Sequence, residues 1–456
     1  MGGFESSSLG GGQSPVSRSV LLALESSGSS MGGPGSWATR FVPWLRAAGI
    51  DARVAVLLYG DADENAGVVG MLRALGVPTE VHRTIDLRTD TNWFIGQIAK
   101  HPPGLFIANN VPSALYAAMN VRGFGVRSAM VVHSDDPYYY KLIDAFVLGQ
   151  EPSAVDLIVP VSAFLEEKLA PSLVGKVSLQ RIPCGAPRSE VAVAWNEGDL
   201  HLVYVGRFSR FQKRVDEVAK ALCAACDQIP GVRASMVGEG ADRGMVEEIL
   251  RSSAGGGKVQ LVGALTPSEV LGFLPACQVM VLLSDFEGIP IALMEGMAAG
   301  LVPVVTPIRS GIPELVLNGE TGFIVADRHA AFVTAIRSMR EDPALWRQLS
   351  AAARSQFERG FSPDVILNAW SQHIRDSPEP FLPPASLALP IHSWLDFWVD
   401  GSMASGWIGL RLRAQRAAWS VWAVLPPKAR ECLRRIVKSI TAHDGFRLRT
   451  SERHKQ

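Results

Sequence analysis

Short apolar runs alternate with helical stretches along residues 19–190 of the chain. One helical pattern extends from Trp37 to Ala48. Strands that are apolar on both faces and alternate with helices predict a parallel sheet covered by helices on both sides. The apolar runs are "SVLLALES" (19–26), "ARVAVLLY" (52–59), "GLFIANN" (104–110), "RSAMVVH" (127–133) and "DLIVPVS" (156–162).

The alternation breaks at "APRSEVAVAWNEGD" (186–199), which reads as a linker, and then restarts. The pattern predicts a second doubly wound α/β domain of similar size. Ligands of such sheets bind beyond the carboxyl ends of the strands, so the expected site is a cleft between the two domains. The strands predicted for the second domain cover 201–205, 232–237, 258–262, 279–283 and 302–306.

The two ends of the chain differ from these domains. A Gly/Ser-rich start predicts a disordered leader without a secretory signal, and a Pro-rich break follows the helical stretch "PDVILNAWSQHIR" (363–375). The expected organisation is a leader, a first and a second α/β domain, a helix returning to the first domain and a basic Trp-rich extension. The limits assigned to these parts are 1–17, 18–190, 191–361, 362–376 and 377–456.

Composition narrows the class of protein. A 456-residue chain with 47% hydrophobic and 19% charged residues is globular. Its 44 basic and 44 acidic residues give no signature of nucleic-acid binding. The five cysteines form no disulfide framework, which predicts a reducing, cytoplasmic compartment. Cys223-x-x-Cys226 lacks the second cysteine pair that a zinc site needs, so these two cysteines are predicted as core residues.

Two carboxylates stand out in the apolar stretch "SDFEGIPIALMEGMAAGLVPVV" (284–305). Glu287 should lie in the loop after a strand, and Glu295 in the second turn of a buried helix that Gly300 ends. A buried carboxylate needs a partner. The acids suit sugar or ribose hydroxyls, whereas the helix start and its free N–H groups, at Gly288 and Ile289, suit a phosphate. The alternative is that Glu287 caps the helix and Glu295 pairs with a core arginine.

Two cations are expected at the same sheet edge. In "LVYVGRFSRFQKRVDEV", Arg207 follows a strand and Lys213 begins the next helix. Such cations can clamp a diphosphate. Arg210 and Arg214 are interpreted as surface residues. The alternative for the whole stretch is a solvated loop.

These residues carry a family resemblance. "GRFSRFQK", "VGEG", "LVGALTPSEV" and "SDFEGIPIALMEGMAAGLVPVVTPIRSGIPELVLNGETGFIV" occur in that order. The chain thereby resembles a family 4 retaining glycosyltransferase, with Glu287 and Glu295 as its E-x7-E motif. The resemblance spans residues 19–376 and is weaker in the first half. It implies the GT-B fold, in which two Rossmann-like domains face each other across a cleft.

The resemblance also implies roles for residues of the second half. Glu295 would bind the ribose of a sugar nucleotide, and Glu287 would contact the transferred hexose. Arg207 and Lys213 would hold the diphosphate, assisted by the amides of Gly288 and Ile289. Among the matching stretches, Gly240 of "VGEG" and Leu265 of "LVGAL" are further expected substrate-binding residues.

In the first half, Gly32 and Gly33 resemble the family's glycine pair near the phosphates and acceptor, and His133 resembles its strand-end histidine near the reacting carbon. His133 has a plainer reading, a buried histidine bonded to backbone. The chain departs from the family in carrying Arg214 in place of a glycine, "IANN" (107–110) in place of a His-bearing strand end, and "IPCGAP" (182–187). The acceptor side is therefore less well matched than the donor side.

The implied activity is transfer of a hexose, with retention, from a nucleotide-diphosphate sugar to a hydroxyl of a glycan or lipid-linked acceptor, in cell-surface polysaccharide synthesis. No metal cofactor is expected. Alternatives are a sugar-nucleotide epimerase of the same fold, an inactive glycan-assembly module, and a nicotinamide dehydrogenase. The last is disfavoured because the final glycine of "VGEGADRG" (237–244) comes one residue late for a dinucleotide fingerprint.

The extension has a separate character. From Trp407 to Gln456 it holds twelve Lys and Arg residues against three Asp and Glu, and residues 391–456 hold five of the eleven tryptophans. Tryptophan and basic side chains suit an anionic membrane surface. Two readings stay open, a peripheral membrane contact at the inner face and packing on the first domain.

Overall fold

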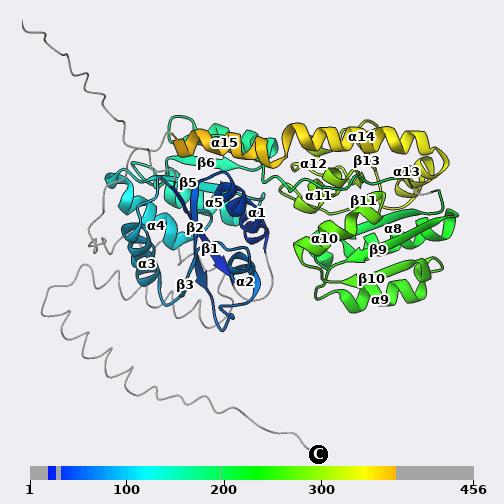
Figure 1. Ribbon diagram of the computed structural model, residues 1–456, viewed down its shortest axis with the longest axis horizontal. Helices are drawn as coiled ribbons and strands as arrows, with labels where there is room; N and C mark the ends of the chain where they lie inside the picture. Colours follow the sequence, from blue (N-terminus) through cyan, green and yellow to red (C-terminus); the bar gives the residue numbers. More distant parts are fainter. Residues whose placement is uncertain (1–18, 27–31, 196, 376–456) are drawn as a thin grey trace, which may run out of the picture. The chain divides into compact units, whose positions relative to one another are not determined.

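The computed structural model describes residues 19–26, 32–195 and 197–375 (Figure 1). These residues all belong to one compact unit. The predicted leader, 1–17, and the predicted extension, 377–456, lie outside the described residues. Among the described helices, none combines the length and the apolar character needed to cross a bilayer.

Residues 19–179 build a seven-stranded parallel sheet, drawn blue to cyan in Figure 1. Its strand order is β3-β2-β1-β4-β5-β6-β7, so the chain winds outward in both directions from β1 and β4. The central strands are buried on both faces, as their apolar runs predict. The strands are β1 Ser19–Ser26, β2 Asp51–Leu58, β3 Thr79–Arg83, β4 Leu105–Ile107, β5 Arg127–Val132, β6 Leu157–Pro160 and β7 Ser178–Leu179.

Helices connect these strands, as parallel pairing requires. Pro residues at the first turn, where a missing N–H costs nothing, begin several of them. The helices are α1 Gly33–Ala47, α2 Gly67–Ala74, α3 Leu87–Lys100, α4 Pro112–Val121, α5 Pro137–Ile143 and α6 Ala163–Leu173.

A second parallel sheet of six strands follows, with the order β10-β9-β8-β11-β12-β13. Between β7 and β8 the described residues form no helix or strand, in agreement with the linker predicted at 186–199. The strands are β8 Leu200–Val205, β9 Val232–Val237, β10 Val259–Gly263, β11 Val279–Leu282, β12 Val302–Val305 and β13 Phe323–Ile324.

The helices of the second half include the long amphipathic α8, whose buried face carries Val215, Val218, Leu222 and Ala225 as predicted. Cys223 and Cys226 on the same helix are buried free thiols, which confirms their prediction as core residues. The helices are α7 Arg210–Lys213, α8 Val215–Gln228, α9 Arg243–Ser252, α10 Pro267–Phe273, α11 Ile291–Ala299, α12 Ile312–Leu315, α13 Ala330–Glu341, α14 Pro343–Gly360 and α15 Pro363–Arg375.

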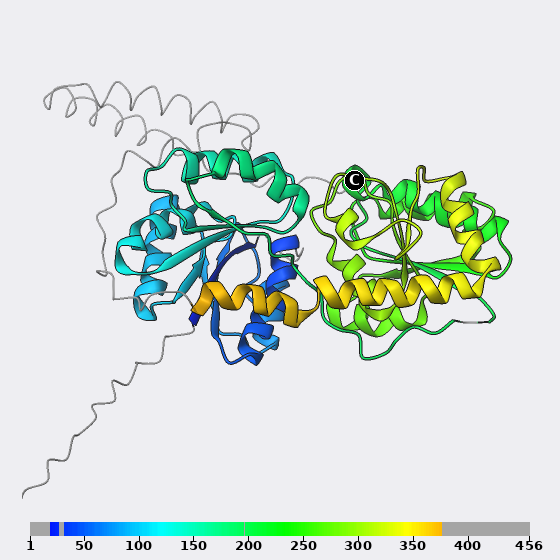
Figure 2. The same cartoon turned by 90° about the horizontal axis from the view of Figure 1, so that it is seen from above.

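The last described helix, α15, packs beside α1 (Figure 2). Its Trp370 lies 5.1 Å from Phe41 and 6.3 Å from Trp37, ring centroid to ring centroid. Trp37 in turn stacks on Phe41 at 4.7 Å and meets the imidazole of His133 edge-on at 5.1 Å. The end of the second half of the chain therefore completes the core of the first.

The structure confirms two parallel-sheet α/β domains. The helix predicted at Trp37–Ala48 begins four residues earlier, at Gly33, because Pro34 suits a first turn. The run predicted at 104–110 is a strand only over Leu105–Ile107, since Asn109 turns the chain away with a left-handed φ of 54°.

Candidate functional site

The predicted cations and acids of the second half gather where β8 and β11 end. Arg207 follows β8, and Lys213 is the last residue of the one-turn helix α7. Glu287 lies in the loop after β11, and Glu295 in the second turn of α11. Helix α11 begins at Ile291 and stops at Gly300, whose φ of 92° permits the left-handed end that was predicted.

Lys213 and Glu287 form a direct ion pair. The Lys213 Nζ donates to Glu287 Oε1 at 2.6 Å. Both side chains are largely withdrawn from water, with exposed fractions of 15% and 7%. Removing one member of such a pair leaves an uncompensated charge, which costs about 3–5 kcal/mol. The structure thus brings a predicted phosphate-binding cation and a predicted hexose-contacting acid together.

Gln212 links Arg207 to the same loop, and the sequence reasoning missed it. Arg207 donates to Gln212 Oε1 at 3.1 Å, and the Gln212 amide donates to the Phe286 carbonyl at 3.1 Å. The Asp285 N–H donates to the Gln212 carbonyl at 3.0 Å. The position of Gln212, between the two predicted cations, was the available signal.

Glu295 is paired with Arg40, a residue of α1. Arg40 Nε donates to Glu295 Oε1 at 2.9 Å, and a second guanidinium nitrogen donates to the same oxygen. The side chains are 11% and 3% exposed. The alternative reading, a buried arginine beside Glu295, is therefore observed. No hydrogen bond to Oε2 occurs within the described part of the chain, so that oxygen can accept from a further donor.

Burial raises the pKa of Glu295 above its ordinary value, and the Arg40 guanidinium acts in the opposite direction. Arg40 also donates to the Ser36 carbonyl at 2.7 Å and to the Ser36 hydroxyl at 2.8 Å. These two bonds fix the guanidinium on α1. Sequence reasoning missed Arg40 because 255 residues separate it from Glu295.

His133 directly follows β5. It is partly exposed, and both of its ring nitrogens lie near other side chains. Its Nε2 lies 3.0 Å from Asn109 Oδ1, and its Nδ1 lies 3.9 Å from the sulfur of Cys184. Desolvation lowers the pKa of His133 to about 3, so the imidazole is neutral at pH 7. Burial raises the pKa of the Cys184 thiol to about 12. The contacts fit an Nε2–H tautomer, in which Nε2–H donates to Asn109 Oδ1 and Nδ1 accepts a weak hydrogen bond from the Cys184 thiol.

Asn109 and Cys184 were not predicted as partners of His133. Both occur in stretches noted as departures from the family pattern, "IANN" and "IPCGAP". Among the described residues, the buried Asn109 Nδ2 has no hydrogen-bond partner. The available signal in the sequence was an asparagine at a strand end, a residue type that adopts a positive φ more readily than most, as Asn109 does.

The predicted glycines have different structural roles. A Cβ at Gly288 would lie 1.9 Å from the His133 carbonyl oxygen, so only glycine fits there. A Cβ at Gly240 would lie 2.3 Å from the Phe208 carbonyl oxygen. By contrast, a Cβ at Gly33 would meet nothing within 4 Å, and one at Gly32 only the Pro34 ring at 3.8 Å. Protein packing therefore explains Gly288 and Gly240 but not Gly32 or Gly33.

The remaining predicted residues lie near this edge. Leu265 is partly exposed in the loop after β10. In the described residues, the amide nitrogens of Gly288 and Ile289 have no hydrogen-bond partner. They precede α11, where the helix dipole favours an anion. Asp136 caps α5 by accepting from Tyr138 N–H, and Asp135 pairs with Lys168.

The arrangement offers two cations, free backbone donors and two carboxylates at one sheet edge. This set can bind an anion and the hydroxyl groups attached to it. Within the described ranges, no group of three or more His, Cys, Asp and Glu side chains is placed to hold a metal ion.

Residues 187–356 match the model of the family described as "Glycosyl transferases group 1". The matched segment holds the whole second sheet and its helices as far as most of α14. The chain is 31% identical over 200 residues to a glycogen synthase of Mycobacterium tuberculosis, covering 42% of this chain and 48% of the relative. It is 41% identical over 116 residues to the putative colanic acid biosynthesis glycosyltransferase WcaL of Salmonella typhimurium, covering 24% and 28%. The chain thus matches about half the length, or less, of these curated relatives.

Solved structures resemble a larger part of the chain. The pneumococcal O-GlcNAc transferase GtfA, in complex with UDP and GlcNAc, has a TM-score of 0.64 at 13% identity, over 78% of this chain and 99% of that one. HepE of Anabaena, in complex with UDP, has a TM-score of 0.62 at 16% identity, over 77% and 98%. The fold is therefore GT-B.

Proposed function

We propose that the chain transfers a hexose, with retained anomeric configuration, from a nucleotide-diphosphate sugar to a hydroxyl of a glycan or lipid-linked acceptor. The relatives named for colanic acid and amylovoran biosynthesis favour a role in cell-surface polysaccharide synthesis. Structural neighbours that hold UDP favour a uridine nucleotide. The observation that carries the proposal is the Lys213–Glu287 pair, inside the matched domain and beside Arg207.

The donor would lie against the carboxyl ends of β8 and β11. Arg207, Lys213 and the amides of Gly288 and Ile289 would receive the diphosphate. Glu295 Oε2 would accept from a ribose hydroxyl, and Glu287 would contact the hexose. Lys213 would then exchange part of its contact with Glu287 for a phosphate oxygen, which leaves both charges paired.

In the reaction, the bond from the anomeric carbon to the diphosphate oxygen breaks, and the leaving oxygen keeps the electron pair. The acceptor oxygen bonds to the same face of that carbon and passes its proton to the leaving diphosphate. Arg207 and Lys213 stabilise the developing charge, which is electrostatic catalysis by groups already in place. No metal ion enters this proposal.

His133 would act near the reacting carbon as a neutral hydrogen-bonding group. Its low pKa, set by burial, disfavours a charged imidazolium there. Since Nε2–H is directed to Asn109 and Nδ1 to Cys184, the side chain is oriented before substrate arrives. A His133→Ala variant should therefore lose turnover more than donor affinity.

The first experiment is a thermal-shift panel with UDP, GDP and ADP and their glucose or mannose conjugates. A nucleotide that binds only the folded state raises Tm. We expect one base to stabilise the protein, and a Lys213→Met/Arg207→Met variant to lose most of that shift. If no nucleotide raises Tm, or if the double variant responds like the wild type, the donor site is refuted.

The second experiment identifies the reaction. The wild-type protein is incubated with the stabilising sugar nucleotide, alone and with a panel of glycan and polyprenyl-phosphate acceptors. Glycosyl transfer requires an acceptor, an epimerase alters the sugar without one, and an inactive module changes nothing. NMR of the product reads the anomeric configuration, so an inverted product would refute retention.

We further propose that the Trp-rich basic segment 391–456 contacts anionic lipid from the cytoplasmic side, which would bring the enzyme to a lipid-linked acceptor. This segment lies outside the described residues. Deleting it should reduce co-sedimentation with vesicles containing anionic lipid while leaving nucleotide binding intact. Unchanged co-sedimentation would refute the membrane contact.

A further inference from the structure

Helix α7 and the loop after β11 are joined residue by residue. Phe211 meets Phe286 edge-on, 5.4 Å between ring centroids. Gln212 exchanges backbone and side-chain hydrogen bonds with the same loop, and Lys213 pairs with Glu287. The two segments that carry the proposed donor-binding charges are therefore bonded to each other.

The next residue, Arg214, has an unusual backbone. Its φ of 48° and ψ of 44° lie in the left-handed region, which residues with a side chain rarely adopt. Arg214 connects the end of α7 to the start of α8. Its backbone conformation therefore sets the direction of the chain directly after Lys213. A glycine would hold the same turn without strain. The arginine side chain must therefore supply something that glycine lacks.

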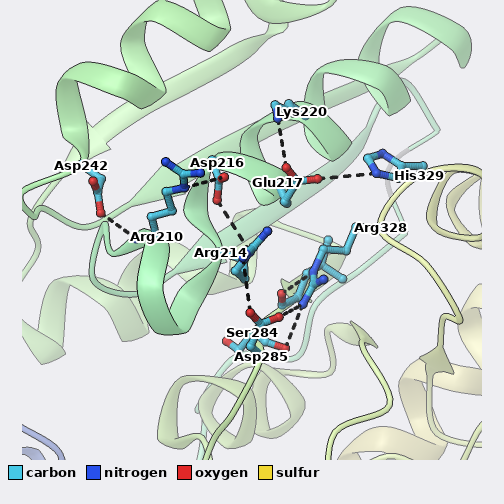
Figure 3. A network of polar contacts seen from close by, with 11 residues as sticks. Arg210, Arg214, Asp216, Glu217, Lys220, Asp242, Ser284, Asp285, Arg328 and His329 are labelled. Atoms are coloured by element: carbon cyan, nitrogen blue, oxygen red, sulfur yellow. Dashed lines mark hydrogen bonds and ion pairs between the residues drawn. The ribbon is translucent and has the colours of Figure 1, made fainter.

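That side chain extends to the loop after β11 (Figure 3). Arg214 Nη1 lies 3.6 Å from Asp285 Oδ2, and Arg214 Nε lies 4.0 Å from Asp216 Oδ1. Neither the Nε nor that Oδ1 has a hydrogen-bond partner within the described residues, so charge alone draws them together.

Asp285 is held from its other side as well. Arg328 donates to Asp285 Oδ1, and its Nε donates to the Leu283 carbonyl at 2.9 Å. Figure 3 shows Asp285 between Arg214 and Arg328. Asp285 directly precedes Phe286 and Glu287, so its position sets where the Glu287 carboxylate lies.

Arg210, the first residue of α7, serves as a comparison for Arg214. It also pairs with Asp216, at 3.4 Å, but among the described residues it has no hydrogen bond or ion pair to the loop after β11. Its side chain is 65% exposed, whereas that of Arg214 is 33% exposed. A surface role fits Arg210 but not Arg214.

We propose that Arg214 is a positioning residue, which fixes Lys213 against Glu287 by tying the end of α7 to Asp285. It touches no substrate in this proposal and acts through Lys213. The inference rests on the proposed function, since it assigns Arg214 a part in aligning the diphosphate clamp.

The test compares Arg214→Gly with Arg210→Gln. The first variant keeps the backbone turn and removes the tie, and the second removes one positive charge beside Asp216 while the ion pair of Arg214 with Asp285 stays in place. Steady-state release of nucleoside diphosphate is measured from UDP-glucose, GDP-mannose and ADP-glucose. We expect kcat to fall about tenfold in Arg214→Gly, as a small displacement of a positioned group predicts, with Tm unchanged or higher. Arg210→Gln should match the wild type.

A double-mutant cycle shows whether the effect passes through Lys213. Arg214→Gly should not lower kcat further in a protein that already carries Lys213→Met, because Arg214 acts by positioning the lysine that this variant lacks. Asp285→Asn should resemble Arg214→Gly, and Arg214→Lys should restore part of kcat. If Arg214→Gly keeps wild-type kcat, or multiplies the deficit of Lys213→Met, the inference is overturned.

The wild-type measurement separates the two levels of proposal. A wild-type protein that releases no nucleoside diphosphate from any of the three donors, and whose Tm none of them raises, contradicts the proposed function and the inference with it. A wild type that is active, with an equally active Arg214→Gly variant, contradicts the inference alone.

Discussion

At the scale of single residues, the buried Arg40–Glu295 pair has two consequences. It lets a carboxylate lie in an apolar helix, since burial without a partner would drive that group to its neutral form. It also leaves one carboxylate oxygen without a partner among the described residues. Arg40 neutralises the carboxylate at one oxygen, and the other oxygen can still accept a hydrogen bond. Such a carboxylate suits recognition of a neutral diol.

The first prediction concerns Arg40→Met. Loss of the guanidinium should raise the pKa of Glu295 further above its unfolded value, so the folded state binds more protons than the unfolded state above pH ~4.5. Stability should therefore fall more steeply with rising pH than in the wild type. The loss at pH 8 should approach about 3–5 kcal/mol, the cost of breaking a buried pair. Urea unfolding at pH 5 and pH 8 measures it.

Arg40→Met/Glu295→Gln is the control, because it removes the titrating group. Its stability relative to the wild type should vary little between the two pH values. An equal loss for Arg40→Met at pH 5 and at pH 8 would show that packing, and not the charge of Glu295, accounts for the effect.

The second prediction concerns His133. Its pKa of about 3 lies below the unfolded value of ~6.5, so the unfolded state binds more protons between these limits. Stability present above pH ~6.5 is lost as pH falls, with a slope of up to about 1.4 kcal/mol per pH unit. His133→Gln should flatten that slope in urea unfolding from pH 4 to pH 7. Exposed His101→Gln should leave it unchanged, and an unchanged slope in His133→Gln would exclude His133 as its source.

Residue types at the site were predictable, but their partners were not. The eight-residue spacing of Glu287 and Glu295 is local and can be read from the chain. Arg40 pairs across 255 positions and Cys184 approaches His133 across 51. No periodicity encodes such pairings, because only the folded sheets bring these segments together.

At the scale of elements, the central strands and the edge strand β10 were predicted, whereas the other three edge strands were not. The strands β3, β7 and β13 are edge strands, and they were missed because each is short or partly exposed and lacks an apolar run. The site depends on the central strands β8 and β11, whose apolar runs "LHLVYV" and "VMVL" are buried. The charged residues predicted for the site follow these two strands, so their position at one sheet edge was predictable although the sheet margins were incomplete.

The third prediction concerns the contact between the loops after β8 and β9. A Cβ at Gly240 would lie 2.3 Å from the backbone carbonyl oxygen of Phe208, so Gly240→Ala must displace one of these loops. We expect a loss of about 1–3 kcal/mol, as for overpacking, together with weaker nucleotide binding, because Phe208 directly follows Arg207. Thermal unfolding with and without UDP measures both effects.

Gly244→Ala is the matched control. Gly244 lies in the first turn of α9, and a Cβ there would meet nothing within 4 Å. Alanine should stabilise that helix by up to about 1 kcal/mol. If Gly240→Ala is as stable as Gly244→Ala, the close approach to Phe208 does not constrain the loop.

At the scale of the whole molecule, the first sheet depends on the last described helix. Trp370 of α15 is 1% exposed and contacts Trp37 and Phe41 of α1, the helix that begins at Gly33 and carries Arg40. Trp37 also contacts His133. One apolar cluster therefore connects the end of the described chain to two residues of the candidate site. Two similar α/β patterns in sequence do not predict this connection, because it arises from side-chain packing between distant segments.

The fourth prediction follows from that cluster. Trp370→Ala should cost about 3–5 kcal/mol, the range for removing a buried aromatic side chain. The loss should appear as faster amide hydrogen exchange in α1 and at the end of β5, while β8 and β11 keep their protection. Trp370→Phe should cost far less, since the buried indole Nε1 has no hydrogen-bond partner among the described residues. Exchange that accelerates equally in β8 would mean that the two sheets unfold as one cooperative unit, and that α15 stabilises both.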